Sequence, residues 1–90
     1  MRAVVTVAGT DKVGIIAAAT GKLAELNVNI LDITQTILPP NFFTMVMLVD
    51  CSACTISFSD LALALKAQGE EMDLSVRIQR EEIFDAMHRI

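Results

Sequence analysis

Tryptophan and tyrosine are absent from this 90-residue sequence, histidine occurs once, and cysteine and proline occur twice each. Acidic residues outnumber Lys and Arg by 11 to 7, which gives a formal net charge of −4. A nucleic-acid-binding surface needs basic residues to replace the counterions of the phosphates, and base stacking needs exposed aromatic rings. The charge and the aromatic content therefore argue against a nucleic-acid partner.

Long hydrophobic runs are also absent. The longest runs have five residues, as at Met45 to Val49, which ends at Asp50. A membrane-spanning helix needs about 20 apolar residues. The chain opens with Met1 and Arg2 and continues directly into a strand-like pattern, so we expect no signal peptide, no membrane partner and a cytoplasmic location.

Motifs for catalysis and cofactor binding are missing as well. Cys51 and Cys54 form a lone CxxC, whereas a structural zinc site needs a second pair of ligands and His88 is the only histidine. No Ser/His/Asp or Cys/His set has a supporting pattern, and no P-loop is present. We expect no enzyme activity, no cofactor and no metal. The cysteines have two interpretations: an incidental loop pair, whose replacement by serine changes stability little, or a redox or metal pair.

What the sequence does contain is an excess of apolar residues, at 53% of the chain with a mean hydropathy of +0.54. Ninety residues form a single domain, 1–90, and a chain of this size buries only about 60–65% of its surface on folding. Monomers rarely expose the large apolar patch that would remain. We therefore expect a homodimer or a larger assembly of copies.

Alternating apolar and β-branched residues predict strands over 3–8, 28–38, 42–49 and 74–79. Pro39, Pro40 and Asn41 must form a turn, because neither proline can donate to a ladder. Asp32 and Thr34 interrupt the alternation of the second strand, where a bulge would fit. The third strand is apolar on both faces, as expected for a central strand or for one covered by another subunit.

Helical spacing predicts two longer helices and a short last one. The first ends at Asn27, and its buried stripe is expected to comprise Ile16, Ala19, Thr20, Leu23 and Leu26. The second begins at a Ser57 or Ser59 cap with Asp60 in its first turn, ends at Gly69 and buries Phe58, Leu61 and Leu65. The last helix, with His88 near its C-terminus, carries on one side Ile83, Phe84, Met87 and Ile90.

The order is therefore βαββαβ with an extra helix. Right-handed crossovers place both main helices on one face of a four-stranded sheet. The predicted fold class is α+β, a ferredoxin-like βαββαβ sandwich with a short extra C-terminal helix. The second face of the sheet is bare within one subunit, which agrees with the apolar excess.

The first strand–helix junction, Gly9-Thr10-Asp11-Lys12-Val13-Gly14-Ile15, is the candidate binding site. The helix start offers unpaired N–H groups to an anion such as a carboxylate, and Gly14 lets a ligand approach closely. Asp11 would accept bonds from an ammonium group. The alternative is that Asp11 simply caps the helix and Gly9 is a turn residue.

Asn29 is the second candidate, at the start of the second strand. Its amide carries both donors and an acceptor and could bridge the amino and carboxylate groups of a ligand. The alternative is that Asn29 satisfies the backbone of a local turn.

The strand–GTDKVGI–helix–NVNILD–strand arrangement resembles the ACT domain, a regulatory module that commonly senses amino acids. The family pattern has an Asp or Asn three residues before a Gly, then an xNI start to the second strand, and Asp11, Gly14 and Asn29-Ile30 hold those places here. The ending Ile83 to Ile90 also looks like that of small stand-alone ACT proteins of the UPF0237 type.

The resemblance implies that a small polar metabolite, such as an amino acid, binds between two subunits. The ligand-binding residues it implies are Thr10, Asp11, Lys12, Gly14, Ile15, Asn29 and Ile30. The competing hypothesis is an interaction module with a vestigial pocket, in which the C-terminal helix and the bare sheet face hold a regulated protein.

Overall fold

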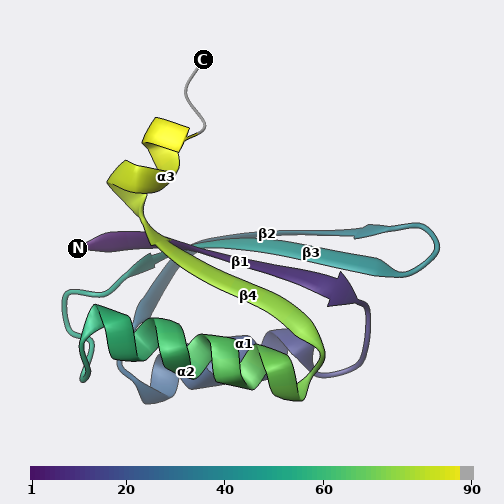
Figure 1. Cartoon of the computed structure of the whole chain (residues 1–90), viewed down its shortest axis with the longest axis horizontal. Helices are drawn as coiled ribbons and strands as arrows, with labels where there is room; N and C mark the ends of the chain where they lie inside the picture. Colours follow the sequence, from purple (N-terminus) through teal and green to yellow (C-terminus); the bar gives the residue numbers. More distant parts are fainter. Residues whose placement is uncertain (88–90) are drawn as a thin grey trace.

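The computed structural model describes residues 1–87 and has the predicted ferredoxin-like architecture. Its strands are β1 (Arg2–Thr10), β2 (Asn29–Leu38), β3 (Phe42–Asp50) and β4 (Leu74–Arg80), in one antiparallel sheet of order β2-β3-β1-β4. Its helices are α1 (Ile15–Glu25), α2 (Phe58–Glu71) and α3 (Glu81–Met87). Figure 1 shows α1 and α2 on one face of the sheet and α3 on the other side. None of the helices within residues 1–87 is long and apolar enough to cross a membrane.

The core lies between the sheet and the α1–α2 layer. Alternation along β1 and β3 turns every second residue toward the helices. Of the two alternatives for the third strand, the central position is the one observed. Side chains no more than 3% exposed come from both central strands and both long helices: Ala3, Val5, Val7, Ile15, Leu23, Phe43, Met45, Met47, Val49, Leu61 and Leu65.

The predicted stripe of α1 is wrong at its first position. Ile15 is 3% exposed and packs in the core, whereas Ile16 is 39% exposed. The helix begins directly after Gly14, so Ile15 shares its face with Ala19, Leu23 and Leu26, all in or against the core. Ile16 instead faces outward beside the first turn, where it becomes part of the candidate site.

The start of α2 is as predicted, but its end is not. Ser57 caps the helix by accepting a 3.1 Å hydrogen bond from the N–H of Asp60. Gly69 does not end the helix, which continues to Glu71. Gly69 is buried against β4, and a Cβ there would lie 2.5 Å from Cγ2 of Val76. The glycine therefore permits close helix–strand packing rather than terminating the helix.

The connections follow the sequence expectations closely. Asn27 has a left-handed φ of 62°, and the register between β2 and β3 shifts at Ile30/Asp32, which confirms the bulge. Pro39 and Pro40 form the hairpin turn. The predicted contribution of the Met87 side chain, and those of His88 and Ile90, lie outside the described residues.

The two cysteines lie in a loop after β3, as predicted, and both side chains pack inward. Cys51 is only 8% exposed and belongs to the core, and Cys54 packs against the same cluster. Both are free thiols. The turn between them is exposed, but the two side chains pack against the core, so replacing Cys51 by serine would bury a hydroxyl group.

Candidate functional site

A shallow, open pocket of about 290 Å³ lies where β1 gives way to α1. Its walls are the first turn of α1 and the helix-facing side of the β2–β3 hairpin. Pockets for drug-sized ligands begin near about 300 Å³, so the space suits a small metabolite. It is lined by Asp11, Lys12, Gly14, Ile15, Ile16, Ala17, Gln35, Ile37 and Phe43.

Gly14 shapes the start of α1. Its φ of 92° is left-handed, and a Cβ at this position would meet nothing within 4 Å. Conformation rather than crowding therefore favours glycine here. The first helical bond runs from the N–H of Ala18 to the Gly14 carbonyl at 2.9 Å. Earlier N–H groups have no partner within a helix and receive no side-chain cap from Gly14, so they are available as donors to an anion.

Asp11 is not the helix cap, because the N-cap is Gly14. The backbone N–H of Asp11 donates to the carbonyl of Asn41 at 2.7 Å, which ties the junction to the hairpin turn. Within residues 1–87, no hydrogen bond or ion pair occupies its carboxylate. A negative charge therefore borders the same pocket as the free N–H groups.

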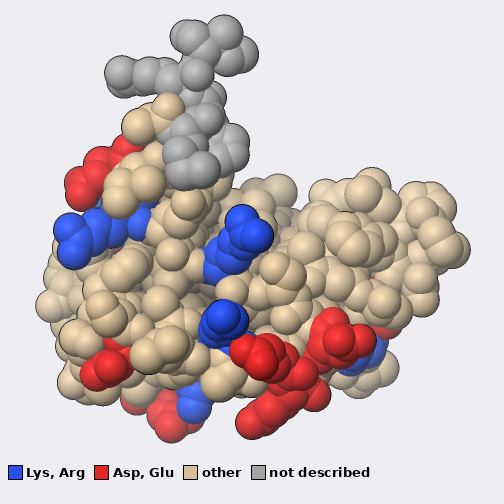
Figure 2. Space-filling model, viewed as in Figure 1, with Lys and Arg blue, Asp and Glu red and all other residues tan. Residues whose placement is uncertain are grey.

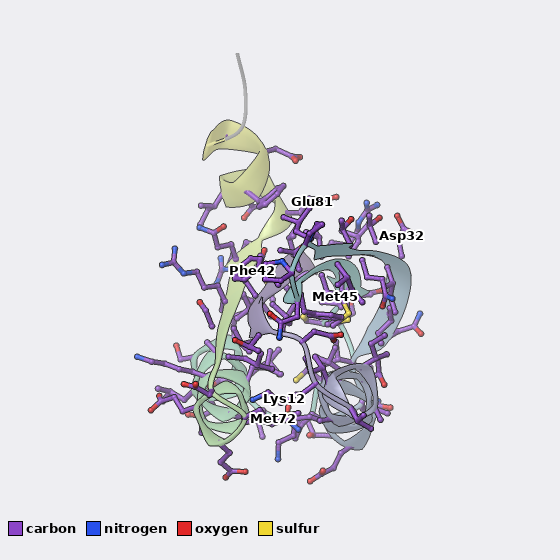
Figure 3. All side chains as sticks on the ribbon, turned by 90° about the vertical axis from the view of Figure 1, so that its right-hand side faces the viewer. Lys12, Asp32, Phe42, Met45, Met72 and Glu81 are labelled. Atoms are coloured by element: carbon purple, nitrogen blue, oxygen red, sulfur yellow. The ribbon has the colours of Figure 1, made fainter. Side chains whose placement is uncertain are left out.

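The ammonium group of Lys12 is occupied elsewhere. It donates to the carbonyl of Met72, the C-cap residue that follows α2, and Figure 3 shows the two residues side by side. A cation at a helix C-terminus is favourable for the helix dipole. Lys12 borders the pocket, but its charge holds the end of α2 against the β1–α1 junction.

Three other residues implied by the resemblance contribute less directly. Ile15 is buried, so it offers the pocket mainly its backbone. Thr10 pairs with Phe42 at the end of β1, and Ile30 packs against the core from β2. Neither Thr10 nor Ile30 is among the residues that line the pocket.

Asn29 lies at the opposite end of the sheet from the pocket. It pairs with Asp50, whereas Leu38, at the far end of β2, pairs with Phe42 beside Thr10. Leu38 follows Asn29 by nine steps along the strand, which corresponds to about 30 Å. The local turn is held by the neighbouring Asn27, whose amide donates to the carbonyl of Ala53 at 3.0 Å. One chain therefore does not bring Asn29 and Asp11 together.

Sequence reasoning missed the second wall of the pocket. Ile33, Gln35 and Ile37 pair with the buried side of β3, so they lie on the helix-facing side of β2. The sequence does contain a signal for this wall. On one face of the strand, a single polar residue, Gln35, lies between Ile33 and Ile37. Phe43 forms part of the floor and is 2% exposed.

The outer edge of β2 is an unusual surface. β2 pairs only with β3, and from Leu31 to Leu38 every residue is exposed. Its large apolar residues are 40–52% exposed: Leu31, Ile33, Ile37 and Leu38. Asp32 is its one charged residue. In Figure 2 the projecting hairpin is largely tan, in contrast to the charged patches below it.

Comparison with known proteins identifies the family of this chain. The sequence profile of the ACT domain matches residues 2–79. A UPF0237 protein of Listeria innocua is 51% identical over 90 residues, the full length of both chains, and one of Methanocaldococcus jannaschii is 49% identical over 99% of this chain and 98% of its own.

Solved structures give the same result. An ACT domain protein from Streptococcus pneumoniae has a TM-score of 0.82 and 42% identity, with 98% of each chain covered. The regulatory subunit of aspartate kinase from Thermus thermophilus, at 22% identity, shares the fold with a TM-score of 0.66 over 87% of this chain and 50% of its own. The chain belongs to the ACT domain family of regulatory, ligand-binding modules, among the UPF0237 proteins.

Proposed function

We propose that this protein is a non-catalytic, cytoplasmic regulatory module that binds an amino acid, or a similar small polar metabolite, as a homodimer. The observation that carries the proposal is the uncapped N-terminus of α1 beside the free carboxylate of Asp11, both bordering one pocket. A zwitterion matches this pair, with its carboxylate on the N–H groups and its ammonium group on Asp11. Its side chain would lie along Ile16, Ile37 and Phe43.

The edge of β2 supports self-association. Soluble proteins protect sheet edges with charges, prolines, bulges or short strands, because unpaired N–H and C=O groups recruit other strands. β2 has ten residues with a single charge, and its bulge at Ile30/Asp32 lies near the start, away from the exposed apolar end. Antiparallel pairing with β2 of a second copy would satisfy this edge and cover the exposed apolar residues of both strands.

Such pairing would also bring Asn29 and Asp11 to one end of the joined sheet. A two-fold axis through the middle of β2 brings the start of one strand beside the end of the other. Leu38 lies beside Phe42 and, through it, Thr10. The second copy's Asn29 would therefore lie at the same end of the joined sheet as Asp11, about three strand spacings from Thr10. This symmetry accounts for the separation of Asn29 and Asp11 within one chain.

Thermal shift and titration calorimetry with the common amino acids test the proposal. A ligand that binds only the native state at 100 times its Kd adds about 2.7 kcal/mol to stability. The amide and the N-acetyl derivative of the same amino acid should not raise the melting temperature, since the amide lacks the carboxylate and the N-acetyl derivative lacks the ammonium group.

Single substitutions test which side chains bind the ligand. Asp11→Asn and Asn29→Ala should abolish the shift while leaving the melting temperature of the free protein nearly unchanged, because both side chains lie on exposed or half-exposed positions. Glu25→Gln, an exposed acid at the far end of α1, is the matched control and should bind normally. Absence of any shift at millimolar amino acid would contradict the proposal.

The second candidate is a partner-binding module without a ligand. The open sheet face favours it, since Phe42 and Val46 remain 43% and 40% exposed there. This hypothesis requires that no amino acid shifts the melting temperature, so the same titration separates the two.

A further inference from the structure

The turn that follows β3 holds the two cysteines of the chain at its two corners. The N–H of Cys54 donates to the carbonyl of Cys51 at 3.1 Å, which defines a hydrogen-bonded turn of four residues. Such a turn keeps its first and last Cα atoms within about 7 Å. Disulfides bridge Cα separations of about 4.4–6.8 Å, so the backbone already has the span of a bridge.

The two thiols also lie on the same side of this turn. Cys51 belongs to the core and Cys54 packs against it, whereas Ser52 and Ala53 between them are exposed. Burial raises the pKa of the Cys51 thiol, and the proximity of Cys54 raises it further. Cys54 is the more accessible of the pair, so it is the thiol that an external reagent meets first.

The turn is bonded to the corner between α1 and β2. The Asn27 amide donates to the carbonyl of Ala53 at 3.0 Å, and the N–H of Thr55 donates to the carbonyl of Leu26 at 3.1 Å. Ala53 and Asn29 line one hollow beside this corner. These contacts offer a change of geometry between Cys51 and Cys54 a direct path to the start of β2.

We propose that Cys51 and Cys54 are a reversible dithiol–disulfide pair whose oxidation alters the corner from Leu26 to Asn29. The oxidant is a low-molecular-weight disulfide of the glutathione class. The Cys54 thiolate attacks one of its sulfurs and releases one thiolate, leaving a mixed disulfide on Cys54. Cys51 then loses its proton and attacks the Cys54 sulfur, which releases the second external thiol. Two protein thiols are oxidised to one disulfide as one external disulfide is reduced to two thiols.

The test is equilibration of the wild-type protein in reduced and oxidised glutathione buffers, followed by acid quenching, intact mass and thiol counting. We expect both thiols to disappear together, the mass of a single chain to fall by two hydrogen masses, and dithiothreitol to reverse the change. Cys54→Ser should show no such loss and at most a single glutathione adduct. Persistence of both thiols, independent adducts on each, or a disulfide between chains would overturn the pair.

Backbone amide spectra of the two redox forms test the second half of the proposal. We expect the signals of Asn27, Val28 and Asn29 to shift between reduced and oxidised wild-type protein, and to stay constant in Cys54→Ser under the same buffers. Shifts confined to residues 50–56 would overturn the link to the corner. The proposal is independent of any ligand, because neither measurement involves an amino acid.

Discussion

Gly69 marks the closest approach of α2 to β4, and its replacement by alanine should destabilise the protein. The added Cβ would lie 2.5 Å from Cγ2 of Val76 and 3.0 Å from the carbonyl oxygen of Leu74. The second contact is with backbone, which cannot rotate away, so the helix must move. Overpacking of this kind costs about 2–3 kcal/mol, and the better helix propensity of alanine offsets about 1 kcal/mol of it. We expect a net loss of about 1–2 kcal/mol in the free energy of unfolding.

Gly21→Ala is the matched control. Gly21 is exposed in α1, and a Cβ there would meet nothing within 4 Å. Alanine should therefore stabilise the protein by about 0.5–1 kcal/mol through its helix propensity alone. Urea denaturation at one fixed protein concentration measures both variants, and the m-values should match that of the wild type. A Gly69→Ala variant as stable as the wild type would refute the packing argument.

Three further predictions concern single side chains. Hydrogen bonds from the Ser52 hydroxyl and then its N–H lower the pKa of Asp50 below its ordinary value of 3.8. Ser52→Ala should raise the pKa of Asp50 in an NMR titration. Because the pKa of Asp50 is lower in the folded protein than in the unfolded chain, the variant should be less stable than the wild type near neutral pH. This difference in the free energy of unfolding should vanish as the pH falls through the pKa of the folded protein. Cys51→Ser buries a hydroxyl and should cost about 1–3 kcal/mol in urea denaturation, with Cys54→Ser costing less; equal costs would contradict the difference in burial. Lys12→Met removes the bond to the Met72 carbonyl and should cost about 0.5–1.5 kcal/mol without changing ligand affinity; a large loss of affinity would show that Lys12 contacts the ligand instead.

The fold could be predicted from the sequence because local and global signals agree. Alternation in β1 and β3, the Pro39-Pro40 turn and the Ser57 cap each specify one structure. Gly69 was misassigned because a buried glycine required for packing and a glycine that ends a helix look alike in sequence. The buried stripe of α1 begins at Ile15 rather than Ile16. The two residues are adjacent and equally apolar, so only the helix start at Gly14 decides which one faces the core.

The candidate site could be predicted only in part. The helix start and Asp11 are local features, so the junction itself reveals them. Gln35 and Ile37 reach the pocket through strand pairing between distant residues, which periodicity alone does not specify. The separation of Asn29 from Asp11 likewise follows from the length of the sheet, since α1 carries the chain back to the other end before β2 begins.

The central claim is that one binding site uses Asp11 of one subunit and Asn29 of the other. Asp11→Ala and Asn29→Ala chains, each unable to bind an amino acid alone, can be mixed in equal amounts, refolded together and titrated by calorimetry. Half of the resulting dimers are mixed and each contains one intact site, so about a quarter of the wild-type sites should return. A mixture that binds no more amino acid than either variant alone would contradict the shared site.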